Sequence, residues 1–269
     1  GYIIPVTSNC NSIVLKKNLD IINSYGKKND YISNISIYFK NFGDINFFKN
    51  YKKNLNNSNI KLHDLNNISI NDDEVYLYAI SDCNFSNVIY LNQNTICFLD
   101  FLEARRLIEE NNYILGFKKN NLLENDKIKT NEHYININSK NFGFEKNMKI
   151  FDDKFLIYKN SLNIKVFSNT ILNSYSKFKN FITPPNILPF FFNILKIPIK
   201  LIDTYEHYIT CLNTTDNSLY PIGDSIISDN SMIYINIDTH KGISEEQLSK
   251  LILINYKKYI KYNIKENIF

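Results

Sequence analysis

The residues with the clearest chemical potential are Gly223, Asp224 and Ser225, within the stretch that runs from Ser218 to His240. They follow a proline and precede a polar turn at 228–231 and an apolar run at 232–237. A small hydroxyl residue on a tight loop, with backbone N–H groups pointing the same way, can form an acyl-transfer nucleophile and its oxyanion hole. The tripeptide alone favours the simpler alternative, an ordinary turn between two strands.

A nucleophilic serine also needs a histidine base, which an acid holds in the correct tautomer. The chain has four histidines, and none of them lies in a segment whose pattern is that of a catalytic base. A surface or hydrogen-bonded structural role is therefore expected for each of them. They are His63, His133, His207 and His240.

Composition excludes several function classes. The chain of 269 residues can hold one large domain or two small ones, and its net charge of +4 comes from lysines dispersed among acids. Arg105 and Arg106 are the only arginines, so neither a nucleic-acid partner nor phosphate recognition by arginine is expected. The richness in Asn and Lys is typical of AT-rich coding sequence, so their abundance carries no argument. No apolar run approaches the roughly 18 residues of a spanning helix.

The cysteines and the ends of the chain leave two questions open. The four cysteines lie too far apart for the usual zinc pairs, so no metal and no cofactor is expected. They form either two disulfides, with Cys83–Cys97 the most local pairing, or four buried thiols; the other two are Cys10 and Cys211. The sequence begins at Gly1 rather than Met, so a preceding segment can have been removed.

Short apolar runs at roughly ten-residue spacing predict an antiparallel β protein. The run at 75–80 is apolar on both faces and predicts a central buried strand. Helical spacing of apolar residues predicts helices only at 98–110 and 251–264. The expected strands are 2–6, 12–15, 35–39, 60–70, 75–80, 88–91, 113–117, 134–137, 155–158, 164–167, 208–212 and 232–237.

The order of these pieces resembles the trypsin/chymotrypsin-like serine proteases. Residues 113–117, 194–203 and 209–213 look like successive strands of the family's second barrel, and 223–225 falls at its nucleophile. Residues 255–260 resemble the opening of its terminal helix, and 35–44 and 71–80 resemble two strands of its first barrel.

The resemblance implies an all-β fold of two antiparallel six-stranded barrels, with a C-terminal helix and a short helix near 98–110. The N-terminal barrel and interbarrel helix would occupy residues 1–111. The second barrel would occupy 112–269, with a large insertion at 118–183 and the terminal helix at 251–264.

The resemblance also implies a set of site residues, with departures that remove the activity. Asn18 stands in the position of the histidine base, and an amide cannot accept the proton. Ile226 and Ile227 replace the glycines of the nucleophile loop. The implied site consists of vestigial Ser225 and Asp73 (or Glu74), the oxyanion-loop residues Gly223 and Asp224, and the pocket residues Leu219 and Asp238.

The function expected from this pattern is that of a catalytically inactive protease homologue, secreted or extracytoplasmic, which binds another protein or has a structural role. Two alternatives stay open. One is an active serine hydrolase that uses Ser225 with an unidentified base, and the other is an unrelated β-rich domain.

Overall fold

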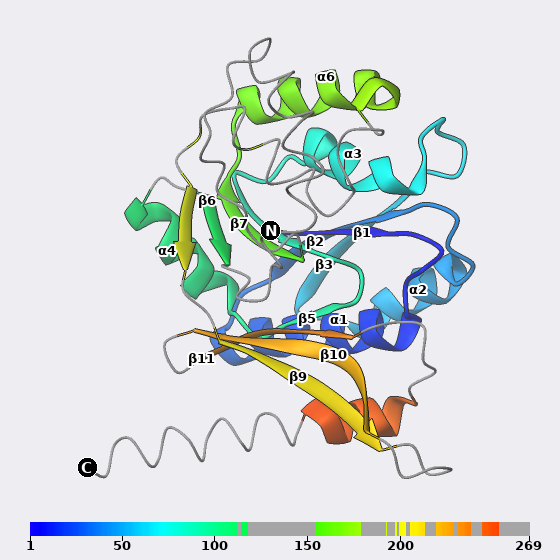
Figure 1. The fold of residues 1–269 in the computed structure, drawn as a ribbon, viewed down its shortest axis with the longest axis vertical. Coiled ribbons are helices and arrows are strands. Elements are labelled where there is room, and N and C mark those ends of the chain that lie inside the picture. The colour runs from blue at the N-terminus through cyan, green and yellow to red at the C-terminus, as the bar shows by residue number, and fades with distance from the viewer. Residues whose placement is uncertain are drawn as a thin grey trace.

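The computed structural model describes residues 1–111, 114–117, 154–178, 192, 197, 199–202, 205–212, 219–228, 231–237 and 244–252. They form a mixed α/β protein in which helices cover both faces of a largely parallel sheet (Figure 1). The predicted all-β fold of two antiparallel barrels is therefore wrong. Among the described residues, no helix is both long enough and apolar enough to cross a membrane.

The elements alternate between strand and helix in the first part of the chain. The helices are α1 (Ser12–Asn29), α2 (Ile45–Tyr51), α3 (Val75–Asp82), α4 (Phe101–Asn111), α6 (Leu162–Phe178) and residues 245–252, with the short 3-10 helices η1 (Lys52–Asn54) and η2 (Asp72–Glu74). The strands are β1 (Tyr2–Val6), β2 (Ser33–Phe39), β3 (Ser58–Asp64), β4 (Asn87–Leu91), β5 (Thr95–Cys97), β6 (Ile114–Phe117), β7 (Phe155–Lys159), β8 (Ile199–Ile202), β9 (Tyr205–Leu212), β10 (Leu219–Ser228) and β11 (Ser231–Ile237).

The main sheet has seven strands in the order β3-β2-β1-β4-β7-β6-β8. β3, β2, β1 and β4 are mutually parallel, and β6 pairs in parallel with β8. β7 runs antiparallel to both of its neighbours. The sheet contains strands from both sides of residue 111, and the predicted division of the chain at that residue stays a prediction.

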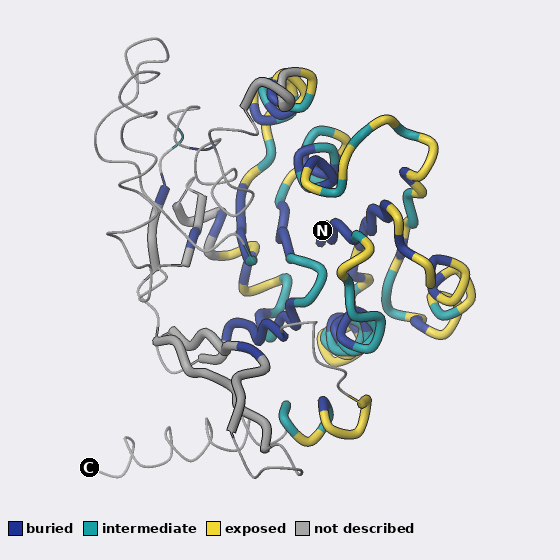
Figure 2. The backbone as a smooth tube through the Cα atoms, turned by 45° about the vertical axis from the view of Figure 1, so that its right-hand side comes forward, coloured by how far each residue is buried: buried dark blue, intermediate teal, exposed yellow. Residues whose placement is uncertain are grey.

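The core lies on both faces of this sheet because alternate residues of each strand point to opposite sides. In β1, Tyr2, Ile4 and Val6 belong to one apolar cluster, which also contains residues of α1, α2 and α4. Ile3 belongs to the cluster on the opposite face, beneath α3 and α6. Figure 2 shows the consequence, with the central strands buried and exposed residues on the outer sides of the helices.

A second sheet of four antiparallel strands, β5-β11-β10-β9, packs beside α1. Val14 of α1 meets Ile96, Ile235 and Ile237 of this sheet and Leu248 of the helix at 245–252 in one buried cluster. The loop after β4 leads directly into β5, so the second sheet is anchored to the first at that point.

Three segments predicted as strands are helices. Residues 12–15 open α1, 75–80 form α3, and 164–167 lie inside α6. A short apolar run fits a buried helix as well as a buried strand, so periodicity over so few residues could not separate the two.

Other expected elements are present. The helix predicted at 98–110 is α4, and the strands predicted at 2–6, 35–39, 88–91 and 232–237 are β1, β2, β4 and β11. The strand expected at 134–137 and most of the helix expected at 251–264 lie outside the described residues. Cys10, Cys83 and Cys97 are free thiols, so the local Cys83–Cys97 disulfide is not formed.

Candidate functional site

Ser225 lies within β10, the strand between β9 and β11, and not on a tight loop. The register sets it opposite Ile235 on one side and His207 on the other. A residue paired on both sides in the interior of a sheet has its backbone N–H and C=O directed along the ladder rather than toward an oxyanion. Leu219 and Asp224 belong to the same strand, and Asp238 lies outside the described residues.

Gly223 is explained by a close approach of two backbones. A Cβ added at this position would lie 2.1 Å from the carbonyl oxygen of Asn236 on β11. The register of β10 also shifts between Pro221 and Gly223, and such irregularities are where strands tolerate proline and glycine. The glycine therefore marks tight strand packing rather than an oxyanion loop.

Asn18 has a structural role. Its side chain is buried in α1, and its Oδ1 accepts a hydrogen bond of 2.9 Å from the backbone N–H of Cys97 on β5. This bond satisfies a buried edge donor of the second sheet and ties that sheet to α1. Asn18, which the resemblance placed at the position of the histidine base, therefore links α1 to the second sheet.

Asp73 and Glu74 belong to the start of a helix and not to a strand that carries a catalytic acid. Asn71 and Glu74 form a capping box, in which Glu74 Oε2 accepts from the Asn71 N–H at 2.5 Å. Asp73 is exposed within η2. The acidic residues 72–74 therefore form the first turn of the segment that continues as α3.

His63 forms a small cluster with Tyr38 and Asp82. Its ring stacks on Tyr38 with centroids 4.1 Å apart, and its Nδ1 lies 3.5 Å from Asp82 Oδ2. Burial lowers the pKa of His63, while the Asp82 carboxylate acts in the opposite direction. The predicted structural role of His63 agrees with these contacts, although its Nε2 has no hydrogen-bond partner in the described part of the chain.

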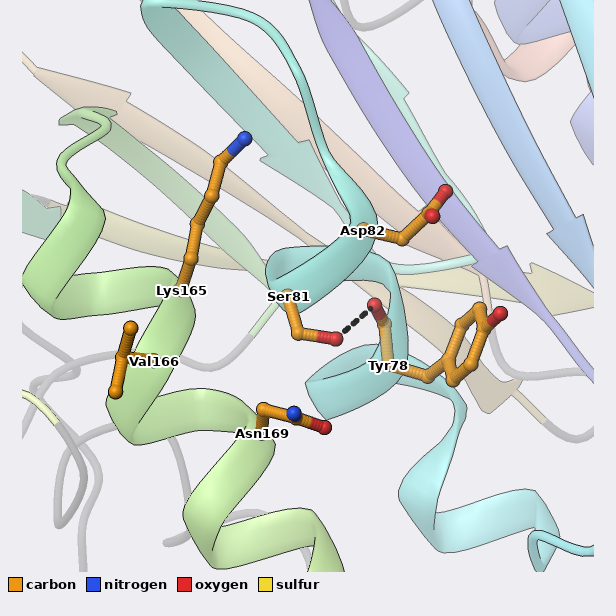
Figure 3. A pocket seen from close by; sticks show the side chains of 6 residues that line it. All are labelled: Tyr78, Ser81, Asp82, Lys165, Val166 and Asn169. Atoms are coloured by element: carbon orange, nitrogen blue, oxygen red, sulfur yellow. Dashed lines mark hydrogen bonds between the residues drawn. The ribbon is translucent and has the colours of Figure 1, made fainter.

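Asp82 also borders an open groove of about 360 Å³ between α3 and α6 (Figure 3). Ser81 donates its hydroxyl to the carbonyl of Tyr78 in its own helix, and Lys165 donates to Asn84 at 2.9 Å. These two polar groups already have partners inside the protein, so the groove offers fewer groups to a ligand than its composition suggests.

The strongest candidate site lies at the carboxyl ends of β1 and β4. From β1 the chain adds β2 and then β3 on one side, and it returns to add β4 on the other side (Figure 1). The two loops that leave β1 and β4 therefore start from adjacent strands at the same edge of the sheet. In open α/β sheets, the crevice outside the carboxyl ends of such strands is where ligands bind.

The two loops at this edge of the sheet are joined by hydrogen bonds. The loop 7–11 follows β1, and the loop 92–94 follows β4. Gln93 Oε1 accepts from the Thr7 N–H at 2.6 Å and from the Thr7 hydroxyl at 3.2 Å. Asn94 Oδ1 accepts from the Asn11 N–H at 3.0 Å, and Asn94 Nδ2 donates to the carbonyl of Asn9 at 3.4 Å.

The other flank of the crevice is also held in place. Ser8 donates to Asp72 at 3.1 Å, and Asn41, which follows β2, donates to the other carboxylate oxygen of Asp72 at 2.8 Å. The buried Lys40 ammonium donates to the carbonyls of Leu65 and Ile68, so its charge is used inside the protein. The segments that follow three parallel strands are therefore held together by hydrogen bonds at this edge of the sheet.

The groups at this edge of the sheet are amides, hydroxyls, the Cys10 thiol and the Asp72 carboxylate. Burial raises the pKa of the Cys10 thiol, and the nearby Asp44 carboxylate adds to this shift, so the thiol stays protonated and is a poor nucleophile. No group of three His, Cys, Asp or Glu side chains that could hold a metal ion occurs among the described residues. The site is suited to binding through hydrogen bonds.

Sequence reasoning missed this site, although the signal was present. An apolar strand at 2–6 is followed by the polar segment Thr7–Asn11, and an apolar spacing typical of a helix then continues through Val14, Leu15, Leu19 and Ile22. Strand, polar loop and amphipathic helix in that order indicate a βαβ unit. Residues 12–15 taken alone predict a strand, and that prediction is wrong because they form the first turn of α1.

Comparisons with known proteins do not assign the chain to a family. No family model matches it, and no curated protein matches it. Among solved structures, the galactosyltransferase LgtC in complex with donor and acceptor sugar analogues shares 10% identity at a TM-score of 0.48, over 75% of this chain and 73% of that one.

Two further structures match over a similar part of the chain. Mouse xyloside xylosyltransferase 1 shares 10% identity at a TM-score of 0.44, over 75% of this chain and 84% of that one. The 4-diphosphocytidyl-2C-methyl-D-erythritol synthase of Anaerococcus prevotii shares 13% identity at a TM-score of 0.42, over 75% of this chain and 88% of that one. These matches carry no argument about the activity of this chain.

The resemblance to trypsin-like proteases is wrong, and with it the inactive-protease function and the alternative of a serine hydrolase. The correction comes from this chain's own parallel sheet and from the helices at α1, α3 and α6, which two antiparallel barrels cannot contain. An all-β domain of another kind is excluded on the same ground.

Proposed function

We propose that this chain binds a nucleotide, which lies across the carboxyl ends of β1 and β4. The observation that carries the proposal is the reversal of strand order between these two strands. Dinucleotides and mononucleotides bind at this position in open, doubly wound sheets of comparable strand order.

Two local features support a phosphorylated ligand. α1 begins at this edge with Asn11 as its N-cap, so the positive end of the helix dipole lies beside the crevice. The first turn of α1 contains no acidic residue, and the nearby Asp72 carboxylate already accepts hydrogen bonds from Ser8 and Asn41. Both features are positioned by the short connection between β1 and α1.

Binding to a panel of nucleotides tests the proposal. We expect at least one of UDP, CDP, GDP and ADP, or a sugar conjugate of one, to bind the full chain in isothermal titration calorimetry. Absence of binding by the whole panel would overturn the proposal.

A variant that fills the crevice locates the binding. Ser8 is exposed beside it, so Ser8→Trp should place a bulky ring there, weaken binding at least tenfold and leave the far-UV circular dichroism unchanged. Ser24→Trp is the matched control, since Ser24 is an exposed serine in the second half of α1, about 18 Å along the helix from its start. Equal effects of the two variants would place the ligand elsewhere.

A turnover measurement addresses activity. Release of free nucleotide from a bound nucleotide sugar, with the sugar bonded to an added acceptor hydroxyl, lost in Ser8→Trp and retained in Ser24→Trp, would make the chain a sugar-transferring enzyme; release with the sugar passing to water would make it a hydrolase. Binding without release would define it as a nucleotide-binding protein alone.

A further inference from the structure

His63 is held between a neighbour on the adjacent strand and a neighbour on α3. It is the register partner of Tyr38 across the parallel strands β2 and β3, and the two rings stack with centroids 4.1 Å apart at an interplanar angle of 18°. Its Nδ1 lies 3.5 Å from Asp82 Oδ2, which also accepts a hydrogen bond of 3.1 Å from the Tyr38 hydroxyl. These three side chains therefore join the last residue of α3 to β2 and β3.

The second ring nitrogen of His63 has no such neighbour. Nε2 is buried and makes no hydrogen bond in the described part of the chain. In the neutral ring this nitrogen can be the one without a proton, whereas in the protonated ring both nitrogens carry a proton to donate. A buried donor without an acceptor is costly, and the cost is larger for a charged group. The protonated ring therefore fits this position poorly.

The charged and titratable groups around the ring act in opposite directions. The Asp82 carboxylate on α3 favours the protonated ring, while the Lys61 ammonium on β3 disfavours it. Tyr78 of α3 lies edge-on to Tyr38, and burial raises the pKa of Tyr78, so it stays neutral. The Asp82 side chain is 40% exposed and that of His63 only 14%, so water weakens the attraction of the carboxylate. Burial prevails, and the pKa of His63 is lowered in the folded chain.

We propose that His63 is a proton-sensitive contact: when its ring gains a second proton, it leaves the stack on Tyr38, and the end of α3 loosens from β2 and β3. The opening lets water accept from the Nε2 proton. Tyr78, Ser81 and Asp82 line the groove between α3 and α6, so the same step alters one wall of that groove (Figure 3). The inference is independent of the proposed nucleotide site.

Hydrogen–deuterium exchange at pH 7.5 and 5.5 tests the proposal, with rates corrected for the intrinsic pH dependence of amide exchange. We expect amides at 60–64 and 77–83 to exchange at least threefold and up to about tenfold faster at pH 5.5. The upper figure follows because pH 5.5 lies about one unit below the ordinary histidine pKa of about 6.5, which the freed ring regains. Amides at 87–91, in the centre of the main sheet, should keep their rates.

Two variants assign the response to the ring. His63→Phe keeps a flat ring against Tyr38 and cannot gain a proton, so its corrected exchange at 60–64 and 77–83 should agree within about twofold between the two pH values. His63→Gln also cannot titrate in this range and serves as the second variant. Both keep the other three histidines, so a response that persists in them belongs to another group.

Proton NMR of the unmodified chain separates opening from protonation in place. The His63 ring signal, identified by its absence from the variants, should be displaced by the stacked Tyr38 ring at pH 7.5 and move to the position of a free imidazolium at pH 5.5. A signal that titrates and keeps this displacement would overturn the proposal.

Three exchange results would also overturn it. Unchanged rates at 60–64 and 77–83 would mean that the contact does not open. An equal acceleration at 87–91 would mean that the whole chain unfolds instead. A response that survives in both variants would mean that His63 is not the group that titrates.

Discussion

Gly223→Ala is the substitution whose effect follows most directly from the geometry. The new Cβ would lie 2.1 Å from the Asn236 carbonyl oxygen and 3.1 Å from the Ile237 Cα. All of these neighbours are backbone atoms, which cannot rotate away as a side chain can. β10 and β11 must therefore separate by roughly 1 Å at this position before the contact becomes tolerable.

The cost can be estimated from two effects. Overpacking of a well-packed site costs about 1–3 kcal/mol. Separating the strands also weakens one or two ladder hydrogen bonds, each with a net contribution of about 1 kcal/mol. We expect Gly223→Ala to lower the free energy of unfolding by about 2–4 kcal/mol.

Equilibrium unfolding in urea measures this effect, followed by circular dichroism because the chain has no tryptophan. Gly43→Ala is the matched control, since a Cβ there meets no atom within 4 Å. It should leave the free energy of unfolding within about 1 kcal/mol of the unmodified chain, or raise it slightly. Equal values for the two variants would refute the register of β10 on β11.

Three further predictions concern residues outside the crevice. Asn18→Ala leaves the buried Cys97 N–H without an acceptor and should lower the free energy of unfolding by about 2–3 kcal/mol in urea. Glu74→Ala removes half of the capping box with Asn71 and should cost about 1 kcal/mol, whereas Glu74→Gln should cost less. His63 has a lowered pKa in the folded chain, so the unfolded chain binds more protons and stability should fall as pH drops below about 6.5. Thermal unfolding between pH 7.5 and 5 measures this slope, which His63→Phe should reduce.

Each of these predictions has a distinct contrary result. Asn18→Ala with unchanged stability would mean that α1 does not clamp β5. Equal losses for Glu74→Ala and Glu74→Gln would show that the acceptor oxygen of the cap is not what matters. An unchanged pH slope in His63→Phe would assign the titration to another group.

The sequence predicted much of the strand inventory and little of the architecture. β1, β2, β4 and β11 were found because each is an apolar run with turn residues on both sides. α3 was missed because Val75–Ile80 contains no charged residue, so no charged stripe reveals its period, and its buried Val75, Leu77 and Ala79 alternate with the half-buried Tyr76 and Tyr78 as residues of a strand do. Its capping box at 71–74 was the available signal.

The candidate site was less predictable than the strands. Its existence depends on β4 joining β1 on the side opposite β2, which is a pairing between residues far apart in the chain. The polar loops 7–11 and 92–94 are visible in the sequence, but only the strand order makes them neighbours. The hydrogen bond from the Thr7 N–H to Gln93 Oε1 depends in turn on β1 and β4 being adjacent strands.

The central position of β1 has a consequence for how the chain folds during synthesis. β1 needs a partner on both sides, and its second partner, β4, is completed only at Leu91. Until then an almost wholly apolar strand has one unpaired edge, which is the kind of surface that recruits other chains. We therefore expect nascent chains that stop before Leu91 to bind chaperones or aggregate, and the tendency to fall once residues 87–91 have left the ribosome.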